Sequence, residues 1–268
     1  MGSAAGIRFF RFYLHSLYFI IFAAYIMSTK PTLYTCLSPA LLHLYDLNNS
    51  VVVIIDVFRA TSTIASALFN GAKCVIPVDT VAKAVELGRS IGGISAGERD
   101  GKIAEGLQHG NSPLEYSREF VAGKTLVLTT TNGTRLLQMA LDNKADTIVT
   151  GSFPNLSAVC DFLQKQNKNV ILGCAGWKDR YNLEDTLFAG AVINRIKEQF
   201  SIHCDSSLTA EQQYLLVKDD LYGFAPNLTH YHRLVDRYGL IEDIRFCLTE
   251  DIANVLPLYK DGMLIAGK

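Results

Sequence analysis

An apolar run that is followed at once by charged and hydroxyl side chains constrains this 268-residue chain more than any other feature. Apart from Asp56, residues 50–57 (SVVVIIDV) are mostly β-branched and show no alternation of polar and apolar positions. Such continuity is typical of a strand buried on both faces. A segment with helical spacing, residues 60–70, follows and ends at Gly71, a residue type that often terminates helices. We therefore predict a strand, a short turn and a helix.

The same succession recurs along the chain. Strands are also predicted at residues 74–78, 124–131, 145–150 and 169–174, and helices at 81–91, 134–141, 154–166 and 183–200. Regular alternation predicts an α/β fold with helices on both faces of a largely parallel, or mixed, sheet. In such sheets ligands bind beyond the carboxyl ends of the strands. After Ser201 the pattern weakens, and helices predicted at 208–217 and 228–238 have no assigned place beside the sheet.

The N-terminal segment is treated separately. Residues 9–27 are largely aromatic and aliphatic, with Arg8, Arg11 and His15 near their start. This pattern indicates either a signal peptide or membrane anchor, or sequence that precedes a true start at Met27. The uncharged stretch is short beside the roughly 20 apolar residues of a membrane span, so we favour the start at Met27. The predicted division is an apolar extension, residues 1–26, and one domain, residues 27–268.

Composition excludes several classes of protein. With 25 basic and 26 acidic residues and no basic stripe, the chain does not have the charge pattern of a nucleic-acid-binding protein. None of the six cysteines forms a Cys-x-x-Cys pair, which argues against a zinc ribbon or a redox motif. We expect a reduced cytoplasmic protein with buried thiols, associated with a membrane only if residues 9–27 are an anchor. The sequence leaves a homo-oligomer open.

The first strand ends in a group of residues suited to a phosphorylated ligand. Asp56 offers the carboxylate oxygens that Mg²⁺ prefers, and Arg59 can hold two phosphate oxygens. Thr61, Ser62 and Thr63 offer hydroxyl and N–H groups to an anion at the start of a helix. Alternatively, Asp56 or Thr61 only caps that helix. The density of these groups within eight residues favours a ligand site.

Two further segments are less distinctive. Glu98 and Arg99 follow the short strand near Ile94, where they form either part of the site or a surface ion pair of little energetic value. Asn111 and Ser112 precede a proline at the start of a helix, so a role in starting that helix is enough to account for these residue types. We include Asn111 and Ser112 as candidate substrate-binding residues, Glu98 as a candidate metal ligand and Arg99 as a candidate catalytic residue.

Asn132, Gly133 and Thr134 follow the strand predicted at 124–131. Asn-Gly between apolar runs is typical of a hairpin turn, but here a helix follows. The segment therefore favours a polar cradle of hydroxyl, amide and N–H groups for an anion at a helix start.

Two candidates remain ambiguous. Cys174 and Arg180 have the Cys-x5-Arg spacing of cysteine-nucleophile phosphatases, although a buried, inert Cys174 is the favoured interpretation. Glu184 and Asp185 open the long helix at 183–200, where they either stabilise its dipole or complete a magnesium site.

Taken in order, these segments resemble the 2-phosphosulfolactate phosphatase family over about residues 33–196. The matching segments are 56–63 (DVFRATST), 97–99 (GER), 110–113 (GNSP), 130–134 (TTNGT), 174–176 (CAG) and 184–185 (ED) with Gly190. The resemblance implies that residues 27–268 form a phosphatase domain. It also implies Mg²⁺-dependent hydrolysis of 2-phosphosulfolactate to sulfolactate and phosphate, a step of coenzyme M biosynthesis. A different small 2-phospho acid stays open as the substrate.

The clustered groups suggest a mechanism. Some of four carboxylates are expected to bind Mg²⁺, which would lower the pKa of a bound water. These carboxylates belong to Asp56, Glu98, Glu184 and Asp185. Arg59 and Arg99 would neutralise the anionic substrate. Attack by water is the preferred route, and a covalent route through Asp56 or Cys174 is its rival. The alternative from a different functional class is a non-catalytic anion-binding module, but such a module would not need the carboxylates.

Overall fold

The computed structural model describes residues 30–99 and 101–267. The predicted extension, residues 1–26, and the expected start at Met27 lie outside this part of the chain. Within the described residues, no helix combines the length and hydrophobicity that are needed to cross a bilayer.

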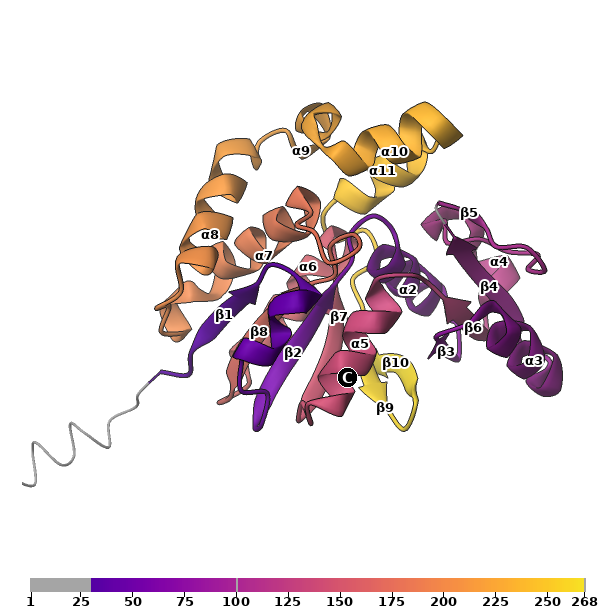
Figure 1. Ribbon diagram of the computed structural model, residues 1–268, viewed down its shortest axis with the longest axis horizontal. Helices are drawn as coiled ribbons and strands as arrows, with labels where there is room; N and C mark the ends of the chain where they lie inside the picture. Colours follow the sequence, from indigo (N-terminus) through magenta and orange to yellow (C-terminus); the bar gives the residue numbers. More distant parts are fainter. Residues whose placement is uncertain (1–29, 100, 268) are drawn as a thin grey trace, which may run out of the picture.

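The described strands form one mixed sheet with the order β1-β8-β2-β7-β9-β10-β3-β6-β4-β5 (Figure 1). Their bounds are β1 Leu33–Cys36, β2 Ser50–Ile55, β3 Cys74–Val78, β4 Ile94–Arg99, β5 Lys102–Ile103, β6 Thr125–Thr129, β7 Thr147–Gly151, β8 Asn169–Cys174, β9 Leu256–Lys260 and β10 Met263–Gly267. One parallel block contains β1, β8, β2 and β7, and the other contains β3, β6 and β4. The antiparallel hairpin β9–β10 joins them. The predicted α/β fold with a largely parallel, mixed sheet is confirmed.

Strand β2 is buried on both faces, as its apolar continuity predicts. Val51, Val53 and Ile55 belong to the core beneath the helices of one face. Val52 and Ile54 alternate with them and belong to a second core on the opposite face. The strand is paired on both edges, with β7 and β8, so none of its surface faces solvent.

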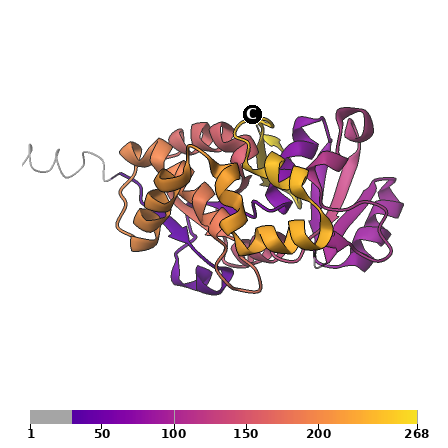
Figure 2. The ribbon, with the colours of Figure 1, turned by 90° about the horizontal axis from the view of Figure 1, so that it is seen from above.

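Helices cover both faces of the sheet (Figure 2). Their bounds are η1 Pro39–Leu44, α2 Ala60–Phe69, α3 Val81–Ile91, η2 Pro113–Glu115, α4 Arg118–Val121, α5 Gly133–Asp142, η3 Phe153–Asn155, α6 Leu156–Gln164, α7 Leu183–Ile196, η4 Lys197–Gln199, α8 Asp205–Val217, α9 Leu221–Phe224, η5 Ala225–Asn227, α10 Thr229–Tyr238 and α11 Ile241–Leu248. Helix α7 packs on β8 and against α8. A Cβ atom at Gly190 of α7 would lie 2.1 Å from the carbonyl oxygen of Ala210, so this close packing requires glycine.

Two predicted helices are shorter than expected. Pro154 lies in the 3-10 turn η3, and α6 begins only at Leu156. Helix α7 ends at Ile196 and continues as the 3-10 turn η4. Both differences fall at helix ends, where tighter turns commonly replace α-helical hydrogen bonding.

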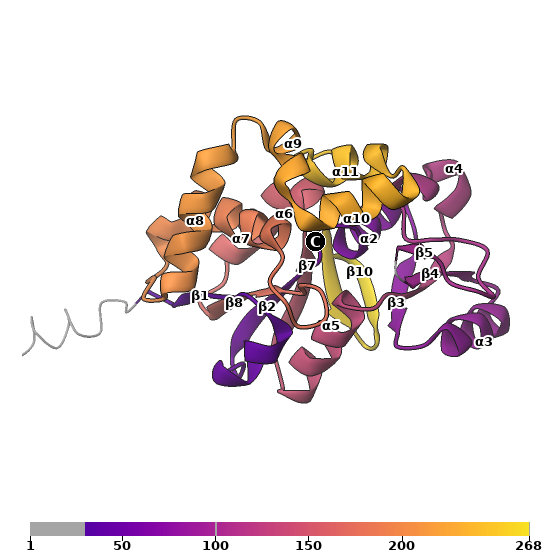
Figure 3. The same cartoon turned by 45° about the horizontal axis from the view of Figure 1, so that its top comes forward.

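The C-terminal third of the chain, which the sequence left unplaced, covers the top of the molecule. Helices α10 and α11 lie above the space between the two parallel blocks (Figures 1 and 3). Helix α11 packs against η2 and η3. The chain then descends into the middle of the sheet as β9 and β10.

Candidate active site

A cavity of about 450 Å³ lies where the loops after β2, β4 and β6 face α10. The strand-end wall is formed by acidic, amide and arginine side chains, which include Asp56, Arg59, Glu98, Asn111 and Asn132. The opposite wall is cationic and aromatic, and includes Trp177, Lys178, His230, Arg233 and Arg237. Such a cavity can hold a multiply charged anion beside two carboxylates.

Asp56 is the first residue after β2 and is only 9% exposed. Its Oδ2 accepts a hydrogen bond of 3.0 Å from the N–H of Gly133, the first residue of α5. Burial, aided by the charges of Glu98 and Glu184, raises the pKa of Asp56 to about 8. The ends of β2 and β6 therefore meet here, with a strongly perturbed carboxyl group between them.

Gly133 lies close to the carboxylate of Asp56. A Cβ atom there would lie 3.0 Å from Oδ2 of Asp56 and 3.4 Å from the Cβ of Ala60, so any side chain would crowd the carboxylate. The neighbouring Asn132 lines the cavity, and its Oδ1 accepts a bond from the N–H of Lys178. The hydroxyl group of Thr134 contacts that of Thr130 rather than the cavity.

The hydroxyl groups of Thr61, Ser62 and Thr63 face the interior of the fold. Ser62 donates to the carbonyl of Val57, and Thr63 donates to that of Asn111. The Thr61 hydroxyl accepts the N–H of Asp56 at 3.2 Å. None of the three lines the cavity, so their side chains shape the turn beneath it.

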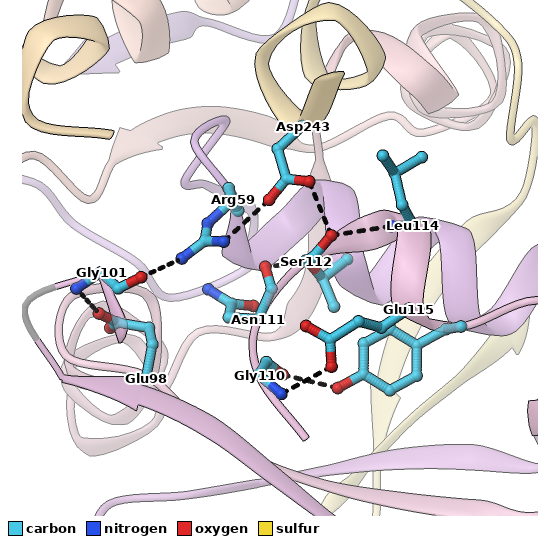
Figure 4. A network of polar contacts seen from close by, with 11 residues as sticks. Arg59, Glu98, Gly101, Gly110, Asn111, Ser112, Leu114, Glu115 and Asp243 are labelled. Carbon is cyan, nitrogen blue, oxygen red and sulfur yellow. Dashed lines mark hydrogen bonds and ion pairs between the residues drawn. The ribbon is translucent and has the colours of Figure 1, made fainter. Parts of the chain in front are cut away.

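Arg59 is 5% exposed and holds three segments together (Figure 4). Its guanidinium pairs with Asp243 of α11 at 2.8 Å and donates to the carbonyl of Gly101 at 3.0 Å. Ser112 donates to the other oxygen of Asp243 at 2.7 Å. These bonds fix the guanidinium at the edge of the cavity and use only some of its five N–H donors.

Asn111 brings an unsatisfied acceptor to the cavity. The residue is 4% exposed, and its buried Oδ1 finds no hydrogen-bond partner within the described part of the chain. Buried polar atoms are nearly always paired, so an orphan atom in a cavity wall points to a ligand, an ion or a water there.

Glu98 and Arg99 diverge, although they are adjacent in sequence. Glu98 lines the cavity, where its two oxygens accept the N–H groups of Thr131 and Gly101 at 3.2 and 2.9 Å. Arg99 points away from it and donates to the carbonyl of Glu98 and to the hydroxyl of Thr129. The structure therefore brings Glu98, but not Arg99, to Asp56.

Glu184 and Asp185 are buried at the start of α7. Both oxygens of Asp185 accept backbone N–H groups, from Val57 at 2.9 Å and from Gly176 at 3.0 Å. Burial and the charges of Glu184 and Asp56 raise the pKa of Asp185 well above its usual range. Oε1 of Glu184 lies 2.7 Å from Nδ1 of His230, and since a carboxylate can only accept, this contact places the hydrogen on Nδ1.

The four predicted metal ligands do not form one cluster. Among residues 30–99 and 101–267, no three His, Cys, Asp or Glu side chains are grouped so that they could hold an ion together. Glu184 and Asp185 do not line the cavity, which leaves Asp56 and Glu98 in its wall. Mg²⁺ is often held by one or two carboxylates together with water and substrate oxygens, so this smaller set suits it.

Cys174 ends β8 and is completely buried in the core. Burial raises the pKa of its thiol well above the usual range, which disfavours the thiolate that a nucleophile requires. Arg180 is exposed in a tight turn, where its backbone bonds with that of Trp177. Neither residue lines the cavity, so the Cys-x5-Arg spacing does not produce a phosphate loop there.

No role for α10 was predicted from the sequence, although the helix forms much of one wall of the site. The cavity is lined by residues spaced three, four, seven and eight positions apart: His230, Arg233, Leu234, Arg237 and Tyr238. This spacing defines one helical face. The spacing of His230, Arg233 and Arg237 can be read in the sequence, but nothing there indicates what these residues face.

Comparison with known proteins gives the family. A family model described as 2-phosphosulpholactate phosphatase matches residues 36–262. The chain belongs to this family. Its members are phosphoric monoester hydrolases by name, and the match extends over the C-terminal third that the motifs did not cover.

Individual relatives in the 2-phosphosulfolactate phosphatase family agree. One, from Caldanaerobacter subterraneus subsp. tengcongensis, is 40% identical over 225 residues, which are 82% of this chain and 91% of the relative. Another, from Thermotoga maritima, is 41% identical over 80% of this chain and 90% of its own length. A third, from Synechocystis sp., is 40% identical over 76% and 87%. Each is named a probable 2-phosphosulfolactate phosphatase.

Proposed function

We propose that this protein hydrolyses 2-phosphosulfolactate to sulfolactate and phosphate. The observation that carries the proposal is the cavity itself, which sets the buried carboxyl group of Asp56 opposite the cationic wall formed by Lys178, Arg233 and Arg237. The substrate named for the family carries a phosphate, a carboxylate and a sulfonate on three carbons. A site for it needs several cations at one time, and this cavity has them.

Mg²⁺ is part of the proposal. Asp56 and Glu98, with the orphan Oδ1 of Asn111, supply the hard oxygen donors that the ion prefers. When bound, the ion would neutralise charge on the transferring phosphoryl group and would lower the pKa of a coordinated water. Burial and the repulsion of the nearby acidic groups together raise the pKa of Asp56, and a bound divalent cation would relieve that repulsion.

The protein's own groups account for orientation and proton transfer. Arg59 is held by Asp243 and Gly101, so its remaining N–H donors can bind phosphate oxygens without a loss of side-chain freedom. His230, whose Nδ1 is held by Glu184, can give a proton from Nε2 to the leaving oxygen when its ring is in the imidazolium form. Attack on phosphorus by water stays the preferred route; Cys174 does not reach the cavity, so the rival covalent route would have to run through Asp56.

The test is an assay of phosphate release by the full chain from 2-phosphosulfolactate, with Mg²⁺ and with a chelator. Phospholactate and phosphoglycolate serve as parallel substrates. Mg²⁺-dependent turnover that prefers the sulfonate supports the proposal. Turnover of the other esters alone would replace the substrate, and binding of 2-phosphosulfolactate without turnover would favour an anion-binding module.

The proposal includes the role in coenzyme M biosynthesis that the family resemblance implies. Cells that lack this chain should accumulate the phosphorylated sulfonate and lose sulfolactate. Unchanged levels of both metabolites would separate the protein from that pathway while leaving its enzymatic activity to the assay above.

A further inference from the structure

One face of helix α10 is cationic, and it lies across the cavity from the wall that contains the acidic residues. Arg233 and Arg237 lie one helical turn apart on this face, and both line the cavity across from Asp56 and Glu98. Figures 1 and 3 show the helix lying over the space between the two parallel blocks. A ligand whose phosphate lies at the strand ends therefore extends its other end toward α10.

Arg233 is held in place without having its hydrogen-bonding capacity used. Its guanidinium carbon lies 4.1 Å from the centre of the Trp177 ring, a cation–π stack that fixes the plane of the group. Its buried Nη2 has no hydrogen-bond partner among the described residues. A rigid, buried donor that no protein group accepts from is expected to bind an anionic oxygen of a ligand.

The loop that carries Trp177 adds to the same wall. Lys178 follows Trp177 and lines the cavity, and its backbone N–H donates to Oδ1 of Asn132 in the strand-end wall. The cations on this side of the cavity thus come from α10 and from one loop that is tied to the α5 start. They form a second anion-binding surface, separate from Arg59.

We propose that Arg233 and Arg237 are specificity-determining residues that bind the sulfonate of the substrate. The inference rests on the proposed function, since it assumes that the phosphate lies beside Asp56. A sulfonate has three anionic oxygens at a tetrahedral sulfur, which suits two guanidinium groups one helical turn apart. It also stands at the end of a CH₂ arm, so it can reach past the phosphate to the opposite wall. A substrate that lacks the sulfonate gains nothing from Arg233 and Arg237.

The experiment compares two esters that differ only in the sulfonate, 2-phosphosulfolactate and 2-phospholactate. The variants are Arg233→Gln, Arg237→Gln and Arg233→Lys, with Arg245→Gln as a matched control because it removes an arginine from the neighbouring helix α11 outside the cavity. Arg237 is exposed, so its replacement is not expected to affect folding; a thermal melt checks each variant.

Each glutamine variant is expected to lower kcat/KM for 2-phosphosulfolactate by about 10- to 100-fold, mainly through KM, the usual effect of removing one charge-assisted bond to an anion. The value for 2-phospholactate should change by less than about threefold. Arg233→Lys should recover only part of the loss, because lysine lacks the planar fork. Equal losses on both esters, or no loss on either, would overturn the inference.

A binding titration separates this inference from the proposed function. Sulfolactate and lactate are titrated into the unmodified protein and the two glutamine variants, with no turnover required. Tighter binding of sulfolactate, lost in the variants, would support α10 as the sulfonate site even if the ester were not hydrolysed. Equal affinity of sulfolactate for all three proteins would refute it whatever the activity. Absence of turnover by itself counts only against the phosphatase function.

Discussion

Replacing Asp56 by Asn should stabilise the metal-free protein, although it should abolish activity. The native state keeps the Asp56 carboxyl protonated up to a pKa of about 8, whereas the ordinary value in the unfolded chain is 3.8. Below about pH 4 both states hold the proton, so the residue has no effect on stability. Between about pH 4 and 8 the unfolded state releases the proton and the native state does not, so the native state becomes progressively less stable.

The size of this effect follows from the shift. One pKa unit corresponds to about 1.4 kcal/mol, so the change from 3.8 to about 8 represents on the order of 5 kcal/mol when the pH exceeds both values. Relaxation of the site in solution reduces this figure, and a difference of at least about 2 kcal/mol is expected at pH 8. Asparagine is neutral in both states and can still accept the N–H of Gly133, so it avoids the loss.

The assay is urea unfolding of the unmodified protein and Asp56→Asn between pH 4.5 and 9, in chelator and then with Mg²⁺. In chelator the variant should be more stable, by an amount that grows with pH and levels off above about pH 8. Mg²⁺ should stabilise the unmodified protein only, because the ion binds the native carboxylate. Parallel pH profiles for the two proteins would refute the reasoning, since they would mean that Asp56 ionises normally in the fold.

Three further predictions concern the groups around the cavity. Cys174→Ser should keep kcat within about twofold of the unmodified protein, because the thiol lies in the core away from the cavity. A loss of kcat of more than tenfold would support the covalent thiolate route instead. Arg59→Gln should lower the free energy of unfolding by about 3–5 kcal/mol, because it leaves the buried Asp243 without its charged partner. Thermal or urea unfolding measures this change, and a free energy of unfolding within about 1 kcal/mol of that of the unmodified protein would contradict a buried ion pair. His230→Gln should lower kcat about 100-fold or more with a smaller change in KM, if the imidazole next to Glu184 donates the proton; an unchanged kcat would exclude that role.

The sequence predicted the strand-end half of the site because local signals specify it. Continuous β-branched residues identify β2, and parallel strands place their carboxyl ends on one side, so Asp56 and Gly133 could be expected to meet. What the sequence could not provide was side-chain direction. Whether the hydroxyl of Thr63 faces the cavity or the interior depends on the path of the segment near Asn111, which packs on it from elsewhere in the fold.

The other half of the site depends on contacts between residues far apart in the chain. Arg59 and Asp243 are 184 positions apart, and Glu184 and His230 are 46 apart. No periodicity or motif links them, because the contact depends on α10 and α11 folding back over the sheet. One C-terminal signal was, however, readable. The two-residue turn at Asp261 and Gly262 has positive φ angles of 49° and 84°, as Asp-Gly hairpins require, and it lies between the short strands β9 and β10.

That hairpin affects the order in which the protein can be completed. Strands β9 and β10 come last along the described chain but lie in the middle of the sheet, where Leu258 pairs with Val149 of β7 and Leu264 pairs with Val75 of β3. During synthesis both parallel blocks emerge before the hairpin that joins them, so β7 and β3 each present an open edge with unpaired N–H and C=O groups. The two blocks can therefore become one sheet only after residues 256–267 have left the ribosome, and a chain interrupted before them would keep both open edges within one molecule.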